Sequence, residues 1–308
     1  MIAVRDLHVH YRGGARAVDG VSFDWQPGEV LGVVGESGCG KSTLARAMLG
    51  LVPAADGAVE LDGAPVTSDW RALRRRIQMV FQDPYQTLNP RMRVRAIVAE
   101  PLQIAGTPPG DRVERALEDV GLPASRFADR FPHELSGGQR QRVAIAASLV
   151  LDPEALICDE PVSMLDVSVR AQVLKVLMDL RESRSLALLF ITHDLGLAWT
   201  LCDRIAVMYL GRIVEHGSAA QVIEHPRHPY TQALVAAVPS PGRKTGAKLL
   251  GGEPPDAAHI PPGCRLHPRC PHRFEPCDSQ DPPLFDAGEG EHRAACLLLR
   301  DGNVNGAG

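Results

Sequence analysis

The stretch Gly35-Glu36-Ser37-Gly38-Cys39-Gly40-Lys41-Ser42 constrains the fold of this chain more than any other. It follows an apolar run, residues 30–34, that is typical of a buried strand, and it precedes a segment, residues 43–49, that is typical of a helix. The glycines allow successive backbone N–H groups to turn toward an anion at the positive end of that helix. Strand, glycine loop, Lys-Ser and helix therefore predict a P-loop that binds a nucleoside triphosphate.

Each polar group of this loop has an expected task. Lys41 is expected to bridge the β- and γ-phosphates, and the Ser42 hydroxyl is expected to bind Mg²⁺. Tyr11 lies upstream of the loop, where an aromatic ring can stack on a purine. The residues predicted to contact ATP are Tyr11, Gly35, Ser37, Gly38, Cys39, Gly40, Lys41, Ser42 and Thr43.

Polar side chains follow three further apolar strands. Asp159 ends the run at residues 155–158 and is expected to hold Mg²⁺ as a Walker B aspartate does, and Glu160 is expected to act as the base that activates water. Gln82 and His193 each follow another apolar strand. Because ligands bind outside the carboxyl ends of parallel strands, we expect Gln82 to reach a metal-bound phosphate and His193 the γ-phosphate. The predicted magnesium ligands are Ser42, Gln82 and Asp159, and the predicted catalytic residues are Glu160, His193 and Gln82.

Composition narrows the class of protein. The 308 residues are 44% hydrophobic and carry a net charge of −4, which is typical of a soluble globular protein without a basic footprint for nucleic acid. No apolar run is long enough to span a bilayer, and residues 1–6 do not read as a signal peptide. We therefore expect a cytoplasmic protein that acts at a membrane, if at all, through a partner.

Hydrophobic periodicity divides the chain. Alternating segments at residues 2–11, 21–25 and 58–63 predict a small antiparallel sheet beside a parallel core. Helical periodicity then predominates over residues 83–150, which predicts a helical insertion. Near its end, Ser136-Gly137-Gly138-Gln139 starts another helix with glycines, and this predicts a second phosphate contact that another subunit would use.

In their order, these motifs resemble the ATP-binding subunit of ABC transporters over about residues 1–235. The resemblance implies an α/β fold: a P-loop NTPase (RecA-like) core with an N-terminal antiparallel β subdomain, a helical subdomain at about 83–150 and a small Cys-rich C-terminal extension. It also implies a head-to-tail dimer, in which the signature residues Ser136, Gly137, Gly138 and Gln139 contact the partner's ATP. By the same resemblance Tyr11 stacks on adenine and Asp166 lies in the D-loop.

Residues 81–85, 88–92 and 225–234 are similar to the subfamily that serves oligopeptide, dipeptide and nickel importers, and within it to the F-type ATPase. This similarity implies ATP hydrolysis that powers peptide import, at the cytoplasmic face of the membrane. The implied partners are a homologous ATPase, two permease subunits and an extracytoplasmic solute-binding protein, with no nucleic acid. Import of nickel or another small solute, a soluble ABC ATPase acting on nucleic acid or ribosomes, and a redox sensor stay open as alternatives.

The C-terminal part carries a cysteine cluster. Residues 236–263 are rich in proline and glycine and predict a linker. Beyond it, Cys264, Cys270, Cys277 and Cys296 define an extension over 264–308 without the paired spacing of a zinc ribbon. Similar tails in the peptide-importer group suggest a [4Fe–4S] cluster. Zinc, with help from His267 or His272, and free or disulfide-linked thiols stay open.

Overall fold

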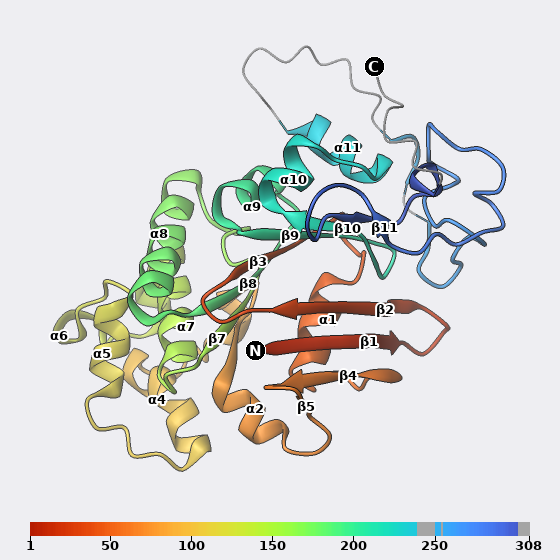
Figure 1. Cartoon of the computed structure of the whole chain (residues 1–308). Coiled ribbons are helices and arrows are strands. Elements are labelled where there is room, and N and C mark those ends of the chain that lie inside the picture. Colours follow the sequence, from red (N-terminus) through yellow and green to blue (C-terminus); the bar gives the residue numbers. More distant parts are fainter. Residues whose placement is uncertain (239–249, 254, 301–308) are drawn as a thin grey trace. The chain divides into compact units, whose positions relative to one another are not determined.

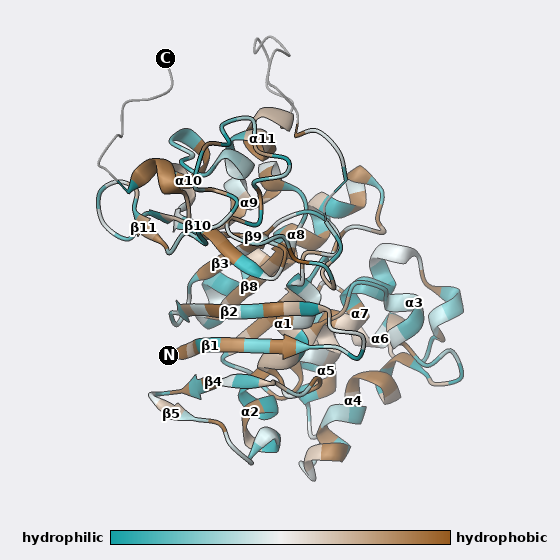
Figure 2. Cartoon of the chain, turned by 90° about the vertical axis from the view of Figure 1, so that its right-hand side faces the viewer, coloured by the Kyte–Doolittle hydropathy of each residue, from teal (hydrophilic) through white to brown (hydrophobic). Residues whose placement is uncertain are grey.

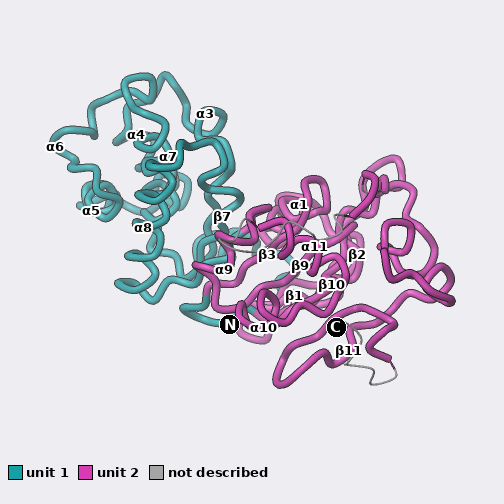
Figure 3. The backbone as a smooth tube through the Cα atoms, turned by 90° about the horizontal axis from the view of Figure 1, so that it is seen from above, with its two compact units in different colours: residues 1, 25–29, 66–190 teal, residues 2–24, 30–65, 191–308 magenta. Residues whose placement is uncertain are grey.

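The computed structural model describes residues 1–238, 250–253 and 255–300 (Figure 1). The chain forms two compact units (Figure 3). The first unit comprises residues 1, 25–29 and 66–190, and the second comprises residues 2–24, 30–65 and 191–308. Among the described helices, none combines the length and the apolarity that crossing a bilayer requires.

The second unit contains a four-stranded sheet in the order β2-β1-β4-β5. Its strands are β1 (Ile2–His10), β2 (Arg16–Trp25), β4 (Asp56–Leu61) and β5 (Ala64–Pro65). Hydrophobic and hydrophilic residues alternate over the last residues of both β1 and β2 (Figure 2), as expected where one face of a strand is buried. The segment predicted at residues 2–11 forms one continuous strand, whose register against β4 shifts between Arg5 and His8.

The second unit also holds strands in the order β11-β12-β10-β9-β3. These are β3 (Val30–Val34), β9 (Arg204–Tyr209), β10 (Arg212–Ser218), β11 (Phe285–Asp286) and β12 (Arg293–Ala294). β3 runs parallel to β9, and every residue of β3 is buried. The predicted strand–turn–strand at 205–217 is the antiparallel pair of β9 and β10.

Helices complete the second unit: α1 (Lys41–Met48), α9 (Leu195–Leu201), α10 (Ala219–Glu224) and α11 (Pro229–Ala237). The sequence predicted α1 and α10 but not α9 or α11. Both of these begin at side-chain caps, since Asp194 accepts from Leu197 N–H and His228 accepts from Tyr230 N–H.

The first unit combines parallel strands with most of the helices. Its strands lie in the order β8-β7-β6. They are β6 (Ile77–Val80), β7 (Ala155–Asp159) and β8 (Ala187–Thr192). The last two residues of β8 belong to the second unit. Its helices are α2 (Trp70–Arg76), α3 (Pro84–Thr87), α4 (Val94–Ala105), α5 (Arg112–Asp119), α6 (Ala124–Phe127), α7 (Gly137–Leu149) and α8 (Val167–Arg184), with a 3₁₀ turn at Pro132–Glu134. Between β6 and β7 the chain is helical, as predicted for residues 83–150.

The Cys-rich segment packs on the second unit. β12 pairs antiparallel with β10 through Ala294 and Arg293, and a 3₁₀ turn (Leu297–Leu299) follows. The segment therefore extends the edge of a sheet that the sequence analysis had assigned to the ATPase core alone. Of the predicted linker at 236–263, residues 239–249 and 254 lie outside the described residues, and so do residues 301–308 at the end of the predicted extension.

A buried carboxylate joins β10, α11 and the Cys-rich segment. Glu215 is fully buried and accepts hydrogen bonds from the backbone N–H groups of Arg227 and His228, both at 2.8 Å. The His292 ring nitrogen Nε2 lies 2.8 Å from the same carboxylate. The His228 Nδ1 accepts from Tyr230 N–H, so the ring of His228 must be neutral at that atom.

The second unit should therefore lose stability in mild acid. Burial lowers the pKa of His228 from 6.5 to about 4. Between these values the unfolded chain binds a proton that the folded chain does not, so stability present above pH 6.5 is lost as the pH falls toward 4, by about 3 kcal/mol in full. The substitution His228→Asn keeps a capping acceptor but does not titrate. Its thermal midpoint should fall less than that of the wild type between neutral pH and pH 5.

The matched control is His259→Asn, which removes an exposed histidine of the same unit. This control should follow the wild-type pH profile. If the thermal midpoints of His228→Asn and the wild type fall equally between neutral pH and pH 5, the role given to His228 is contradicted.

Candidate functional site

The predicted P-loop joins β3 to α1 in the second unit. Gly40 precedes α1 with a φ of 109°, a conformation that only glycine adopts readily. A Cβ atom added to Gly40 would lie 1.9 Å from the carbonyl oxygen of Ala17, and one added to Gly35 would lie 2.2 Å from that of Met208. Two glycines of the motif are thus required by the close approach of neighbouring backbone.

Lys41 closes the loop. Its ammonium group, almost fully buried, donates to the carbonyl oxygens of Gly35 and Glu36 at 2.8 and 2.9 Å. The Cys39 thiol, 3.8 Å from the same nitrogen, is also buried, and burial raises its pKa. The buried lysine and the N-terminus of α1 place positive charge at this loop.

Two further residues of the predicted ATP site lie in this unit. Tyr11 follows β1 with an exposed ring, and its hydroxyl lies 3.2 Å from the hydroxyl of Thr43 in α1. The structure thus brings the predicted stacking residue to the helix that follows the P-loop. His193 is exposed and follows β8 directly, at the carboxyl end predicted for it.

The first unit holds the predicted carboxylates. Asp159 ends β7 as a buried residue, and Glu160 follows it with a φ of 46°. This left-handed backbone is unusual for glutamate, and strained backbone of this kind is concentrated at functional sites. The Gln82 side-chain amide donates to the Glu160 carboxylate at 3.1 Å, so the structure brings together two predicted catalytic residues from different strands.

The predicted signature begins α7 in the first unit. Ser136 is its N-cap and is exposed: its hydroxyl accepts from Gln139 N–H at 3.3 Å, and the Gln139 side chain accepts from Ser136 N–H at 3.0 Å. This reciprocal capping box holds the first turn. A Cβ atom at Gly138 would lie 2.2 Å from a methyl carbon of Val169 in α8, so a glycine is required where α7 meets α8. The exposed Asp166 is the N-cap of α8.

The structure does not pair the C-terminal thiols. Cys264, Cys270, Cys277 and Cys296 are all free, and no three of these four described sulfurs lie within 4.8 Å of one another. Burial raises the pKa of Cys264 to about 11 and that of Cys296 to about 12, and the other thiols of the group add to both shifts. Negative charge on one of these thiols therefore disfavours ionisation of the others.

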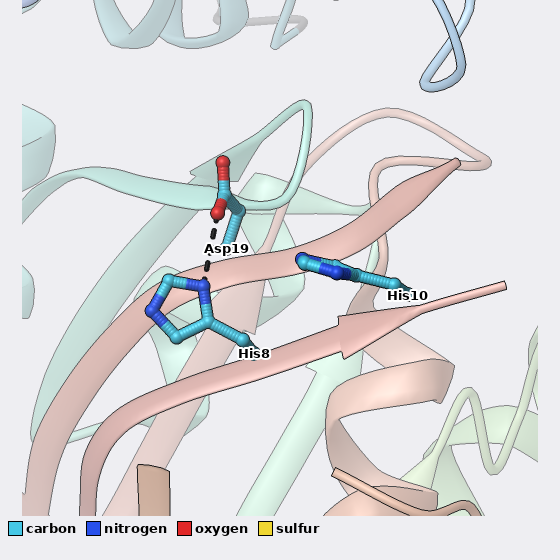
Figure 4. A group of neighbouring side chains, drawn as sticks. All are labelled: His8, His10 and Asp19. Carbon is cyan, nitrogen blue, oxygen red and sulfur yellow. Dashed lines mark hydrogen bonds and ion pairs between the residues drawn. The ribbon is translucent and has the colours of Figure 1, made fainter. Parts of the chain in front are cut away.

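One group that the sequence analysis did not consider has the spacing of a metal site. His8, His10 and Asp19 each offer one ligand atom, and these atoms lie within 4.8 Å of one another (Figure 4). The His8 ring is already engaged on both sides, with Nδ1 3.0 Å from Asp19 and Nε2 3.2 Å from Asp6.

The charges around Asp19 oppose a divalent cation at this group. The Arg265 guanidinium donates to one carboxylate oxygen of Asp19, and guanidinium nitrogens of Arg16 and Arg212 both lie 3.9 Å from that oxygen. Although burial alone would raise it, Arg265 holds the pKa of Asp19 below its usual value. One carboxylate among three guanidinium groups is already neutralised, so we assign this group a structural role.

The sequence alone did not reveal the residues that contact Glu36 of the P-loop. Tyr230 of α11 is fully buried, and its hydroxyl accepts from the backbone N–H of Glu36 at 2.8 Å. Arg269 of the Cys-rich segment pairs with the Glu36 carboxylate at 3.0 and 3.2 Å. Partners so distant along the chain leave no periodicity or motif by which one sequence would reveal them.

Comparison with known families gives two matches along the chain. The sequence model of the family described as "ABC transporter" matches residues 18–163. The one described as "Oligopeptide/dipeptide transporter, C-terminal region" matches residues 214–277.

Full-length relatives are found among curated proteins. A provisionally named peptide import ATP-binding protein of Brucella abortus (strain 2308) is 46% identical over 309 residues, which cover 96% of this chain and 92% of the relative. A provisionally named peptide import ATP-binding protein of Brucella ovis is 43% identical over 310 residues, which cover 96% of this chain and 97% of the relative.

Two solved structures have a similar fold. cbiO1 from Clostridium perfringens, part of the ABC transporter complex cbiONQ, is 31% identical with a TM-score of 0.66 over 73% of this chain and 90% of that one. The ATP-binding cassette MJ0796, solved as a dimer in a post-hydrolysis state with ADP and Pi, is 28% identical with a TM-score of 0.63 over 71% and 99%.

Glycine at position 40 should be indispensable. Gly40→Ala places a methyl group against the Ala17 carbonyl in a left-handed backbone, so it should lower the thermal midpoint strongly and abolish binding of a fluorescent ATP analogue. The control Gly63→Ala has a φ of 80° but nothing within 4 Å of its added Cβ atom, so it should cost only about 1–2 kcal/mol and keep nucleotide binding. Similar melting and binding of the two variants would contradict the steric argument.

Proposed function

Because the chain belongs to the family of ABC transporter ATP-binding proteins, with the oligopeptide/dipeptide transporter region at its C-terminal end, we propose that it hydrolyses ATP to energise the import of peptides. The observation that carries this proposal is the coincidence of a P-loop closed by a buried lysine with 46% identity to a relative named for peptide import and ATP binding. ATP and Mg²⁺ are the ligands that such a site takes.

In the proposed reaction Lys41 would bind the β- and γ-phosphates, and Ser42 and Asp159 would hold Mg²⁺, which would neutralise phosphate charge. Glu160 takes a proton from the attacking water. The hydrogen bond from Gln82 to Glu160 supports their common task, because it aims the carboxylate and brings an amide that can meet the metal. His193 contacts the γ-phosphate, and the Tyr11 ring stacks on the adenine.

A second ATPase subunit completes the proposed site. Ser136, Gly137, Gly138 and Gln139 contact the ATP of the partner subunit, and Asp166 communicates across the dimer. The exposure of Ser136 at the N-cap of α7 supports this role. The dimeric form of the MJ0796 cassette supports the same arrangement by analogy.

The proposed assembly lies at the cytoplasmic face of a membrane. A homologous ATPase would pair with this chain, which we place with the F-type subunits, on two permease subunits fed by a solute-binding protein. Residues 83–105 would contact the permease. The exposed, largely apolar side chains of Tyr85 and Ile104 support this contact. ATP moves the assembly only through its unequal affinity for the open and closed dimers.

We further propose that the C-terminal thiols hold a [4Fe–4S] cluster, which cysteine thiolates can bind, with a single zinc ion as the alternative. Cys264, Cys270 and Cys277 all contribute to raising the pKa of Cys296, which supports the view that the four thiols lie near one another. Cys264, Cys270, Cys277 and Cys296 would hold the cluster, which would supply cross-links within the segment.

Replacing the proposed base should separate binding from turnover. Glu160→Gln keeps the hydrogen bonding and the shape of the side chain but cannot take a proton, so it should bind ATP as the wild type does and hydrolyse it at least about 100-fold more slowly. ATP should then hold two subunits together, as size-exclusion chromatography would show. The control Glu154→Gln removes an exposed carboxylate paired with Arg76 and should keep normal turnover. Near-normal hydrolysis by Glu160→Gln would disprove the assignment of the base.

Metal analysis of the full chain, purified without oxygen, tests the thiol site. We expect about four iron atoms and four sulfides per chain. The Cys277→Ser variant should lose them, and Cys202→Ala, which alters a buried thiol outside the segment, should keep them. One zinc ion per chain would favour the alternative, and a chain free of both metals would refute the proposal.

A further inference from the structure

The P-loop residue Glu36 is held by groups from the C-terminal part of the chain. Its backbone N–H donates to the hydroxyl of Tyr230, and its carboxylate receives both terminal nitrogens of the Arg269 guanidinium. A bidentate pair of this kind fixes both the position and the orientation of the carboxylate.

The surroundings of Arg269 make this pair more than a surface contact. The Arg269 side chain is only 7% exposed, whereas that of Arg273, four residues later, is 52% exposed. A terminal nitrogen of Arg269 also lies 3.4 Å from the hydroxyl of Tyr209, and its Nε donates to the carbonyl of Gly251. The ring of Tyr209 packs against that of Tyr230 with centroids 4.7 Å apart, so Tyr209 links the two residues that support Glu36.

Glu36 in turn supports the phosphate-binding lysine. Its carbonyl oxygen accepts one of the two loop hydrogen bonds of the Lys41 ammonium group, at 2.9 Å. A shift of Glu36 would therefore displace the acceptor that positions Lys41 before nucleotide arrives.

The same short segment ties two thiols to this network. Arg269 is followed directly by Cys270, and Arg265 directly follows Cys264. Arg265 is itself buried and donates to the Asp19 carboxylate and to the carbonyl of Leu210, in the turn between β9 and β10. Each of these two thiols therefore belongs to a residue adjacent in the chain to an arginine that anchors the segment.

We propose that Arg269 is a positioning residue for nucleotide: it reaches from the Cys-rich segment to Glu36 and holds the P-loop ready for ATP, so that the order of this segment sets ATP affinity. The inference rests on the proposed function, since it takes the P-loop to be the ATP site. Arg269 acts through Glu36 and Lys41 and touches no phosphate itself.

A double-mutant cycle tests the first link. Arg269→Gln and Glu36→Gln should each weaken binding of a fluorescent ATP analogue to the full chain by about tenfold, and the double variant should bind no more weakly than either single one. Hydrolysis at saturating ATP should change little. The weaker binding should therefore raise KM and leave kcat nearly unchanged. Arg269→Lys should restore part of the affinity. The control Arg273→Gln, from an exposed pair of the same segment, should bind as the wild type does.

The outcomes separate this inference from the proposed function. If wild type and Lys41→Ala bind the analogue equally, or neither binds it, the ATP site itself is wrong. If Lys41→Ala loses binding while Arg269→Gln and Glu36→Gln keep it, only the inference is wrong. Additive losses in the double variant would likewise overturn it. Should Arg269→Gln melt early, Glu36→Gln still decides, because it breaks the same pair from the other side.

The second link is tested at Cys270. Cys270→Ser should weaken binding of the analogue by a similar factor, and adding Arg269→Gln to it should weaken binding no further. Unchanged affinity in Cys270→Ser would show that the order of the segment does not reach the P-loop. If the losses of affinity in Cys270→Ser and Arg269→Gln add in the double variant, Cys270 acts on ATP binding independently of Arg269.

Discussion

Lys41 donates hydrogen bonds to the carbonyl oxygens of Gly35 and Glu36, and these bonds close the loop between β3 and α1 around a buried positive charge. A buried ammonium group is costly unless it is paired or solvated. Carbonyl dipoles satisfy it in this structure, and phosphate oxygens can satisfy it more fully. The loop is therefore prepared for an anion, and the backbone that crowds Gly35 and Gly40 keeps it in that shape.

In the first unit, the backbone of Glu160 is strained. Glu160 has a φ of 46° while Gln82 donates to its side chain and Ser163 donates to its carbonyl. These contacts hold a conformation that glutamate would otherwise leave, which is the arrangement expected where a side chain must point at a reactant.

Much of the fold follows from local sequence, and the omissions have physical causes. β3 and β7 are continuous apolar runs because both faces of these strands are buried, so residues 30–34 and 155–159 predicted them to within a residue. α8 went unpredicted because only Val173, Leu177 and Leu180 of its 18 residues are buried, which leaves a weak apolar stripe. The strands of the Cys-rich segment have two residues each, too few for a period.

The same division holds for the site. Gly-rich loops and strand-end carboxylates are local patterns, so the sequence alone singles out Lys41 and Glu160 as candidates. The link from Glu36 to Arg269 spans 233 positions and depends on tertiary packing, so only the structure reveals it. The consequence is that a segment predicted as an extension takes part in holding the P-loop.

The central claim is that ATP turnover by this chain is coupled to the passage of peptide through a membrane partner. The most direct measurement reconstitutes the chain with its copurifying permease in vesicles, and follows ATP hydrolysis and uptake of a labelled peptide together. The account predicts that peptide delivered on its binding protein accelerates hydrolysis, that uptake requires MgATP on the side of this chain, and that Glu160→Gln abolishes both. Hydrolysis indifferent to peptide, with no uptake above vesicles that lack ATP, would contradict it.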